Sequence, residues 1–383
     1  MATSNVVHAA FPKPLSEDAT RSYTLPADYY IDPDVFELEK ERIFFRTWQY
    51  VGPASEVAKA GDYMTTTVVD QGVFVIRGRD GVLRAFYNVC QHRAHELLQG
   101  KGNVKAVITC PYHAWAYAPD GSLRAARNCE MVAGFDKQDF GLRPVRVEEF
   151  CNLVFVNLDD DAVPLAEQAS HLEASIRAFV PNYDELVFTG TSTFGDDVMQ
   201  AGWKVVVDNY VECYHCGPAH PAFADMIDMA CYEHTIEGIS AFQLGPETKP
   251  ENSAYNFQAD DPIQRAAFWY LWPTTTINIV PGSVSVNITH IVPRSPTTTS
   301  FVNDRLTVAG EPEDEARNAY LFDLLGREDQ LLCESVQRGL QSRAYDQGRF
   351  IADEAMGGEA EHVVHFFHHM VRQALEEPSS DGA

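Results

Sequence analysis

The sequence predicts an α+β protein in which a small antiparallel β domain precedes a larger domain of long helices around an antiparallel sheet. At 383 residues the chain exceeds what one ordinary hydrophobic core holds, so two domains are expected. Residues 50–158 contain short β-rich runs separated by Gly, Asp and Pro, which is typical of antiparallel strands. The later residues alternate amphipathic helical patterns with further strands.

The composition and charge of the chain indicate a globular protein and argue against some classes of partner. Hydrophobic residues make up 45% and charged residues 22% of the chain, as in a globular protein. No run of apolar residues is long enough for a membrane span, and the N-terminus does not resemble a signal peptide, so we expect a cytoplasmic protein. The formal charge of −26 repels phosphate backbones, which argues against nucleic acid as a partner. The eight cysteines are too few for a disulfide scaffold.

The individual elements follow from local patterns. Residues 33–48 have apolar positions at helical spacing, and residues 165–180 and 200–216 are also predicted helices, the last ending near Gly217 and Pro218. Long amphipathic helices are expected over residues 312–340 and 358–376. The predicted strands are the runs TTTVV, GVFVIRG, LRAFYNV, AVITC and NLVFVNL, followed later by AAFWYLWP, TTTINIVPG, VSVNITHIVP and FVNDRLTV.

The first group of candidate ligands comprises Cys90, His92, Cys110 and His113. The segments NVCQHRAH and VITCPYHAW give a C-x-H pair and a C-x-x-H pair, each in a loop at the end of a β run. Two loops that each supply one thiolate and one imidazole can hold a [2Fe–2S] cluster, with two Cys on one iron and two His on the other. A structural zinc site is the main alternative, but zinc fingers usually group their two Cys together and their two His together.

The second group of candidate ligands lies in DNYVECYHCGPAH and in a later helix. His215 and His220 with one carboxylate form the two-His, one-carboxylate set of non-haem Fe(II) oxygenases. We expect Gly217 and Pro218 to end the helix and turn His220 back towards His215. The segment GREDQLLCESVQRGL offers the carboxylate as Glu328, Asp329 or Glu334, which the pattern alone does not separate.

Three further residues beside His215 need an interpretation. Glu212 lies on the same helical face as His215, where it can accept a hydrogen bond from the imidazole, link the iron site to another subunit, or be a surface residue. Cys213 and Cys216 have the C-x-x-C spacing of zinc or redox pairs. Because they lie near a helix end rather than at a helix start after a strand, we expect them to serve packing.

These motifs, in this order, resemble the α subunits of Rieske oxygenases over nearly the whole chain. The run ITCPYHAWAY and the segment DNYVECYHCGPAHP are most similar to the branch that acts on quaternary ammonium compounds such as carnitine, glycine betaine, choline and stachydrine. The resemblance implies a Rieske domain at residues 46–160 and a helix-grip catalytic domain at residues 161–383, with residues 1–45 packing on the latter. It also implies a homotrimer, in which Glu212 carries electrons between subunits. The pattern ED-x-x-x-x-E-S-V-Q aligns the aspartate ligand of that branch with Asp329.

The resemblance further implies the reaction. It would be O2-dependent hydroxylation next to a quaternary nitrogen, leading to C–N cleavage, with carnitine to trimethylamine as the first expectation. The chain has no dinucleotide fingerprint and no second cluster motif, so a separate flavin and ferredoxin-type reductase must supply electrons from NAD(P)H. Aromatic faces bind quaternary ammonium groups. The candidate aromatic residues are Tyr210, Phe268, Trp269, Tyr270 and Trp272.

Two alternatives remain at this point. One is an aromatic-ring dioxygenase or an O-demethylase of the same architecture. The other is an electron carrier or a zinc-binding protein that has no oxygenase activity.

Overall fold

The computed structural model describes residues 11–192, 198–312 and 314–376. Two compact units make up the chain: Phe44–Gln168 forms one, and the other combines the residues up to Ile43 with those from Ala169 onward. Both contain antiparallel sheets, and the second also carries the long helices, so the predicted α+β fold class is confirmed. No helix of the described residues is both long and apolar enough to cross a membrane.

The unit Phe44–Gln168 is built from β-strands. A seven-stranded antiparallel sheet has the order β1-β10-β9-β4-β3-β2-β5, and a second sheet has the order β6-β7-β8. The strands of the first sheet are β1 (Gln49–Pro53), β2 (Asp62–Val68), β3 (Gln71–Arg77), β4 (Leu83–Tyr87), β5 (Lys101–Asn103), β9 (Pro144–Phe150) and β10 (Leu153–Asn157). The second sheet consists of β6 (Ile108–Thr109), β7 (Ala116–Tyr117) and β8 (Leu123–Ala125). One core cluster, which includes Phe74, Phe86, Trp115 and Tyr117, lies beneath the loops that follow β4 and β6.

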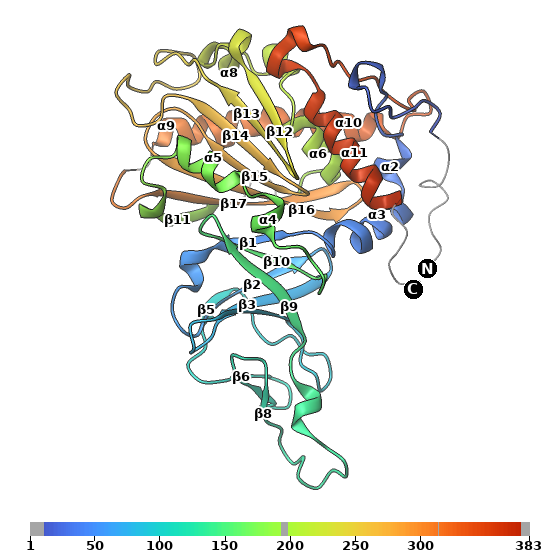
Figure 1. Ribbon diagram of the computed structural model, residues 1–383, viewed down its shortest axis with the longest axis vertical. Helices are drawn as coiled ribbons and strands as arrows, with labels where there is room; N and C mark the ends of the chain where they lie inside the picture. The colour runs from blue at the N-terminus through green and yellow to red at the C-terminus, as the bar shows by residue number, and fades with distance from the viewer. Residues whose placement is uncertain (1–10, 193–197, 313, 377–383) are drawn as a thin grey trace. The chain divides into compact units, whose positions relative to one another are not determined.

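The other unit has one seven-stranded antiparallel sheet, with the order β11-β17-β16-β15-β14-β13-β12 (Figure 1). Its strands are β11 (Leu186–Ser192), β12 (Glu233–Glu237), β13 (Ser240–Gly245), β14 (Ala266–Leu271), β15 (Thr275–Ile279), β16 (Ser285–Ser295) and β17 (Thr298–Val308). The helices are α2 (Asp28–Ile31), α3 (Pro33–Glu39), α5 (Leu172–Phe179), α6 (Trp203–Tyr210), α7 (Cys216–Ala219), α8 (Pro221–Met226), α9 (Glu315–Asn318), α10 (Gly326–Gly339) and α11 (His362–Glu376). The short helix α4 (Leu165–Gln168) ends the first unit.

Side-chain alternation on β14 decides which helices cover which face of this sheet. Trp269 contacts Phe179 of α5, with ring centroids 5.8 Å apart. Its neighbour Tyr270 points to the opposite face and meets Phe367 of α11 at 6.1 Å. Helix α5 therefore covers one face, while α6, α10 and α11 gather on the other (Figure 1).

Two predicted helices differ from the structure in their extent. The helix expected over 33–48 begins as α3, where the Asp32 side chain accepts a hydrogen bond from the amide of Asp34, and it continues as a π-helical segment at Lys40–Phe44. The helix expected over 312–340 is α9, a π-helical segment at Ala319–Leu325 and then α10. Such π-helical segments occur frequently at functional sites, and this one directly precedes α10, the helix that carries Asp329.

Candidate metal centres

Two loops with the same hydrogen-bonding pattern hold the first group of candidate ligands. In one loop the Cys90 amide donates to His95 O at 2.8 Å, and the Ala94 amide donates to Cys90 O at 3.0 Å. In the other, Cys110 N donates to Trp115 O at 2.8 Å and Ala114 N to Cys110 O at 3.0 Å. Both alanines have positive φ, 53° and 57°, which turns each loop back over its cysteine.

The side chains of these loops fit a [2Fe–2S] cluster. Cys90 and Cys110 are both 2% exposed, and the rings of His92 and His113 lie 4.5 Å apart. The Nδ1 atoms of both imidazoles are buried and have no hydrogen-bond partner among the described residues, so they are available as ligands. The Trp115 ring stacks on His92 at 4.8 Å. The hydroxyl of Tyr117 lies 3.4 Å from the Cys90 sulfur, where it can donate to a thiolate.

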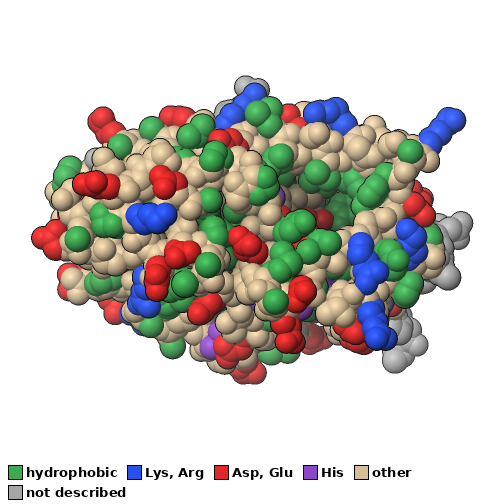
Figure 2. Space-filling view, turned by 90° about the horizontal axis from the view of Figure 1, so that it is seen from above, with side chains coloured by type: hydrophobic (Ala, Val, Ile, Leu, Met, Phe, Trp, Pro, Cys, Tyr) green, Lys and Arg blue, Asp and Glu red, His purple; other side chains and the backbone are tan. Residues whose placement is uncertain are grey.

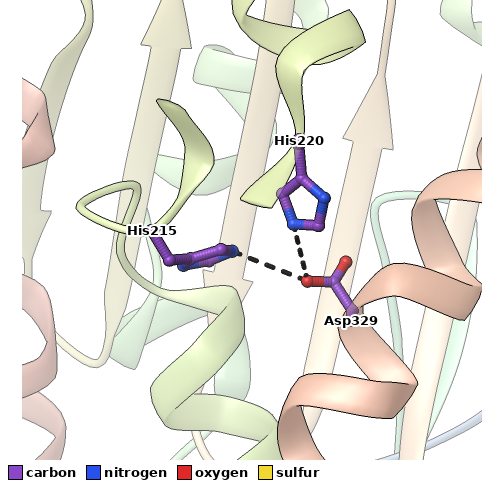
Figure 3. Close-up of side chains that lie close together, drawn as sticks. All are labelled: His215, His220 and Asp329. Atoms are coloured by element: carbon purple, nitrogen blue, oxygen red, sulfur yellow. Dashed lines mark hydrogen bonds and ion pairs between the residues drawn. The ribbon is translucent and has the colours of Figure 1, made fainter. Parts of the chain in front are cut away.

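His215, His220 and Asp329 converge in the other unit (Figure 3). Asp329 Oδ1 lies 3.0 Å from His220 Nε2 and 3.5 Å from His215 Nε2, and the two rings meet edge to face. The amide of Asn209 donates to the same Asp329 oxygen at 3.1 Å. Two imidazole nitrogens and one carboxylate on one side of a cavity could hold a divalent iron and leave its other side open.

The local backbone that brings the two histidines together differs from the prediction. Helix α6 ends at Tyr210, and Gly217 and Pro218 lie inside the next short helix, α7, rather than ending a helix. The Glu212 carboxylate causes the break, because it accepts hydrogen bonds from the amides of Tyr214 and His215. Pro218 is tolerated because it lies in the first turn of α7, where its missing N–H is not needed.

A carboxylate contacts the Nδ1 atom of each imidazole, on the side of the ring opposite to Asp329. Glu212 Oε1 contacts His215 Nδ1, and Glu328 Oε2 lies 2.7 Å from His220 Nδ1. Both Nε2 atoms are thereby turned towards Asp329, as metal-binding histidines require. The sequence analysis offered Glu328 only as a possible metal ligand and did not predict its contact with His220. The sequence shows that Glu328 lies next to Asp329 on a predicted helix, but it does not show where the Glu328 side chain points.

The charges of this group are strongly coupled. Burial would lower the pKa of His215, but hydrogen bonds with Asp329 and Glu212 raise it to about 10. Burial would raise the pKa of Asp329, but the two imidazoles lower it to about 2. The site therefore favours positive charge between its two nitrogens and its carboxylates.

A cavity of about 210 Å³ opens beside the triad. Tyr210 and Phe268, two of the aromatic residues singled out in the sequence, line it, but Trp269, Tyr270 and Trp272 do not. Phe268, Tyr270 and Trp272 do share the face that α6, α10 and α11 cover, as side-chain alternation requires. Tyr270 and Trp272, however, pack against Phe367 of α11. Tyr232, Phe223 and Phe301, which the sequence analysis did not single out, also line the cavity.

Cys213 and Cys216 also line this cavity, and a disulfide joins them on either side of His215. We expected both cysteines to serve packing, and both belong to a buried core cluster, at 2% and 5% exposure. The disulfide is a further feature, which fits the redox pair that the C-x-x-C spacing also allowed. The Cα atoms of the two cysteines lie 4.9 Å apart, within the usual range for a disulfide.

Comparisons with known proteins agree with both centres. Residues 47–136 match the Rieske [2Fe–2S] domain, and residues 182–377 match the catalytic domain of ring-hydroxylating alpha subunits. The carnitine monooxygenase oxygenase subunit of Escherichia coli (strain K12) is 40% identical, over 96% of this chain and 97% of that protein. The chloroplastic choline monooxygenase of Beta vulgaris is 30% identical, over 97% of this chain and 81% of that protein.

Solved structures show the same fold along the chain. A quaternary ammonium Rieske monooxygenase in complex with L-carnitine is 38% identical, with a TM-score of 0.83, and the match covers 93% of this chain and 96% of that one. Naphthalene 1,2-dioxygenase from Rhodococcus sp. is 20% identical with a TM-score of 0.78, over 93% and 95% of the two chains, and therefore shows the fold alone. The resemblance noted in the sequence, and with it the [2Fe–2S] cluster and the mononuclear iron, are confirmed. The chain belongs to the Rieske non-haem iron monooxygenases, whose oxygenase subunits join a [2Fe–2S] domain to a catalytic domain of the ring-hydroxylating alpha type.

Proposed function

We propose that this oxygenase hydroxylates the carbon next to a quaternary nitrogen and so cleaves the C–N bond of a trimethylammonium substrate, with carnitine to trimethylamine as the favoured reaction. The aromatic cavity beside the triad carries the proposal. A quaternary ammonium group has no N–H to donate, so aromatic faces bind it, each contributing about 0.5–2 kcal/mol. Phe223 and Phe268 line the cavity next to His220, with their rings 6.0 Å apart. The names of the similar proteins, which include carnitine and choline monooxygenases, point to the same substrate class.

We assign the cofactors to the residues that converge in each unit. Cys90, His92, Cys110 and His113, within residues 46–160, would hold the [2Fe–2S] cluster. His215, His220 and Asp329, within the domain made by residues 161–383 with 1–45, would hold the iron. When bound, the iron supplies the dioxygen chemistry that replaces a hydrogen by a hydroxyl, after which the carbinolamine collapses. Glu212 and Glu328 keep both Nε2 atoms facing the metal.

We further propose that the working enzyme is a homotrimer with a separate flavin and ferredoxin-type reductase fed by NAD(P)H. In that assembly Glu212 would link the triad to the cluster of a neighbouring subunit. One similar solved structure is described as giving insight into inter-subunit electron transfer, which supports this assignment. The strongly acidic surface would favour a reductase with a basic docking patch.

The decisive experiment supplies the purified oxygenase with a reductase, NAD(P)H, oxygen and a panel of trimethylammonium compounds. Trimethylamine indicates attack on the chain carbon, whereas formaldehyde with a dimethylamine indicates attack on a methyl group. A cis-diol or a demethylated phenol from aromatic substrates, with no amine released, would refute the proposal. Metal analysis should find about three irons and two acid-labile sulfides per chain. Two irons per chain would indicate a simple electron carrier. Zinc in place of iron would exclude both the oxygenase and the electron carrier.

A further inference from the structure

A row of side chains crosses the sheet beneath the cavity. The register pairs Gln243 with Phe268, Phe268 with Asn278, Asn278 with Asn287, and Asn287 with Arg305. Directly paired residues of neighbouring antiparallel strands project from the same face of the sheet. All five residues therefore project from the face that α6, α10 and α11 cover. The first four line the cavity.

The amides of this row are not equivalent. Gln243 Nε2 donates to Tyr210 O at 3.0 Å, and Asn278 Oδ1 accepts the Tyr210 hydroxyl at 2.6 Å. Both side-chain amides therefore form hydrogen bonds that connect helix α6 to the sheet. The carboxamide of Asn287 makes no hydrogen bond within the described part of the chain, although the residue is only 8% exposed. The amide faces the open cavity, where water or a bound ligand group can satisfy it.

The surroundings of Asn287 indicate what that ligand group is. Arg305 is the residue paired with Asn287 on β17 and projects from the same face of the sheet. No Lys or Arg is among the described residues that line the cavity, so an anionic group there would meet uncharged donors, of which the Asn287 amide is one. Asn287 is two strands away from Phe268, which is about 10 Å at the usual spacing of strands. A small extended molecule can therefore reach both.

We propose that Asn287 binds the carboxylate of the substrate, while the aromatic residues near His220 receive its quaternary nitrogen. This inference rests on the proposed function and deepens it. The cavity is then built for zwitterions that carry a trimethylammonium group at one end and a carboxylate at the other. Alcohols such as choline, which lack the carboxylate, make no such contact with Asn287 and bind less well.

The test compares L-carnitine with choline in the holoenzyme supplied with a reductase. Asn287→Asp keeps the size of the side chain but places a negative charge against the carboxylate, and Asn287→Leu removes the donor. Both variants should raise KM for L-carnitine by about tenfold or more, as expected for the loss of one charge-assisted contact, and should change KM for choline by less than about twofold. Asn256→Asp makes the same replacement at an exposed residue outside the cavity and should leave both values unchanged.

The visible spectrum of the cluster and the circular dichroism of each variant report whether it is folded. Wild-type enzyme that converts L-carnitine, together with folded Asn287 variants whose KM values change equally for both substrates or for neither, would overturn this inference alone. A wild-type enzyme that converts neither compound nor any other trimethylammonium substrate would overturn the proposed function, and this inference with it.

Discussion

The two imidazoles of the triad depend on different carboxylates, and this difference can be tested residue by residue. Glu328 holds Nδ1 of His220 at 2.7 Å from the same helix that carries Asp329. Glu328→Gln should weaken iron binding by about 10- to 100-fold, because an amide holds the imidazole less firmly than a carboxylate does. Competition with a chelator measures that affinity. Glu334→Gln on the same helix is the matched control, because Glu334 contacts Gln200 and Gln330 instead of a histidine.

Glu212 has two roles in our proposal, which substitution separates. Glu212→Ala should leave both metal sites filled at saturating iron yet abolish coupled turnover, because the link to the neighbouring cluster is lost. Rapid mixing of the reduced protein with substrate and oxygen should then show a cluster that stays reduced. Glu212→Gln, which retains a hydrogen-bonding group beside His215, separates loss of the link from loss of ring orientation. Near-normal turnover in Glu212→Ala would refute the bridging role.

At the scale of elements, Phe367 packs helix α11 against the sheet. Phe367 is fully buried and meets the rings of Trp203, Tyr270 and Trp272. Phe367→Ala should lower the free energy of unfolding by about 3–5 kcal/mol, since it leaves a cavity at the centre of this layer. Chemical denaturation measures the loss. Val336→Ala, at a half-exposed position of α10, should change it by less than about 0.5 kcal/mol, and equal losses would contradict this packing role.

The same layer shows what the sequence could predict and what it could not. Alternation along β14 correctly placed Phe268, Tyr270 and Trp272 on one face, because the side-chain period of a strand is a local property. Which of them reaches the cavity depends on where α11 lies, and that is set by contacts distant in sequence. Likewise, the spacing of His215 and His220 was visible, but the break in α6 depends on side-chain hydrogen bonds of Glu212.

The candidate metal centres were more predictable than the cavity. The two loops of the cluster carry their chemistry in short motifs, and their matching hydrogen bonds are formed within each loop. The choice of Asp329 over Glu328 required resemblance, because neighbouring residues of one helix differ in direction in a way that spacing alone does not resolve. That Asn287 faces the same side of the sheet as Phe268 follows only from the register of four strands.

At the scale of the whole molecule, acidic side chains are spread over the face of the protein that Figure 2 shows. The net charge of −26 follows from 55 acidic and 29 basic residues. Interactions between such exposed charges are screened by salt over roughly 10 Å at 0.1 M. Electron transfer from a basic reductase should therefore slow as ionic strength rises, which the rate of cluster reduction measures across a series of salt concentrations. A rate that does not depend on salt would argue against electrostatic docking.

Each compact unit contains a complete set of candidate ligands, which has a consequence for the whole protein. Cys90 to His113 lie entirely within Phe44–Gln168, whereas His215, His220 and Asp329 all belong to the other unit. A chelator that removes the mononuclear iron should therefore abolish product formation while the visible spectrum and the reduced EPR signal of the cluster remain. Added Fe(II) should restore activity, and zinc, which does not activate dioxygen, should not. Loss of the cluster signal in step with the mononuclear iron would show that the two sites are not independent, and would contradict the assignment of separate ligand sets.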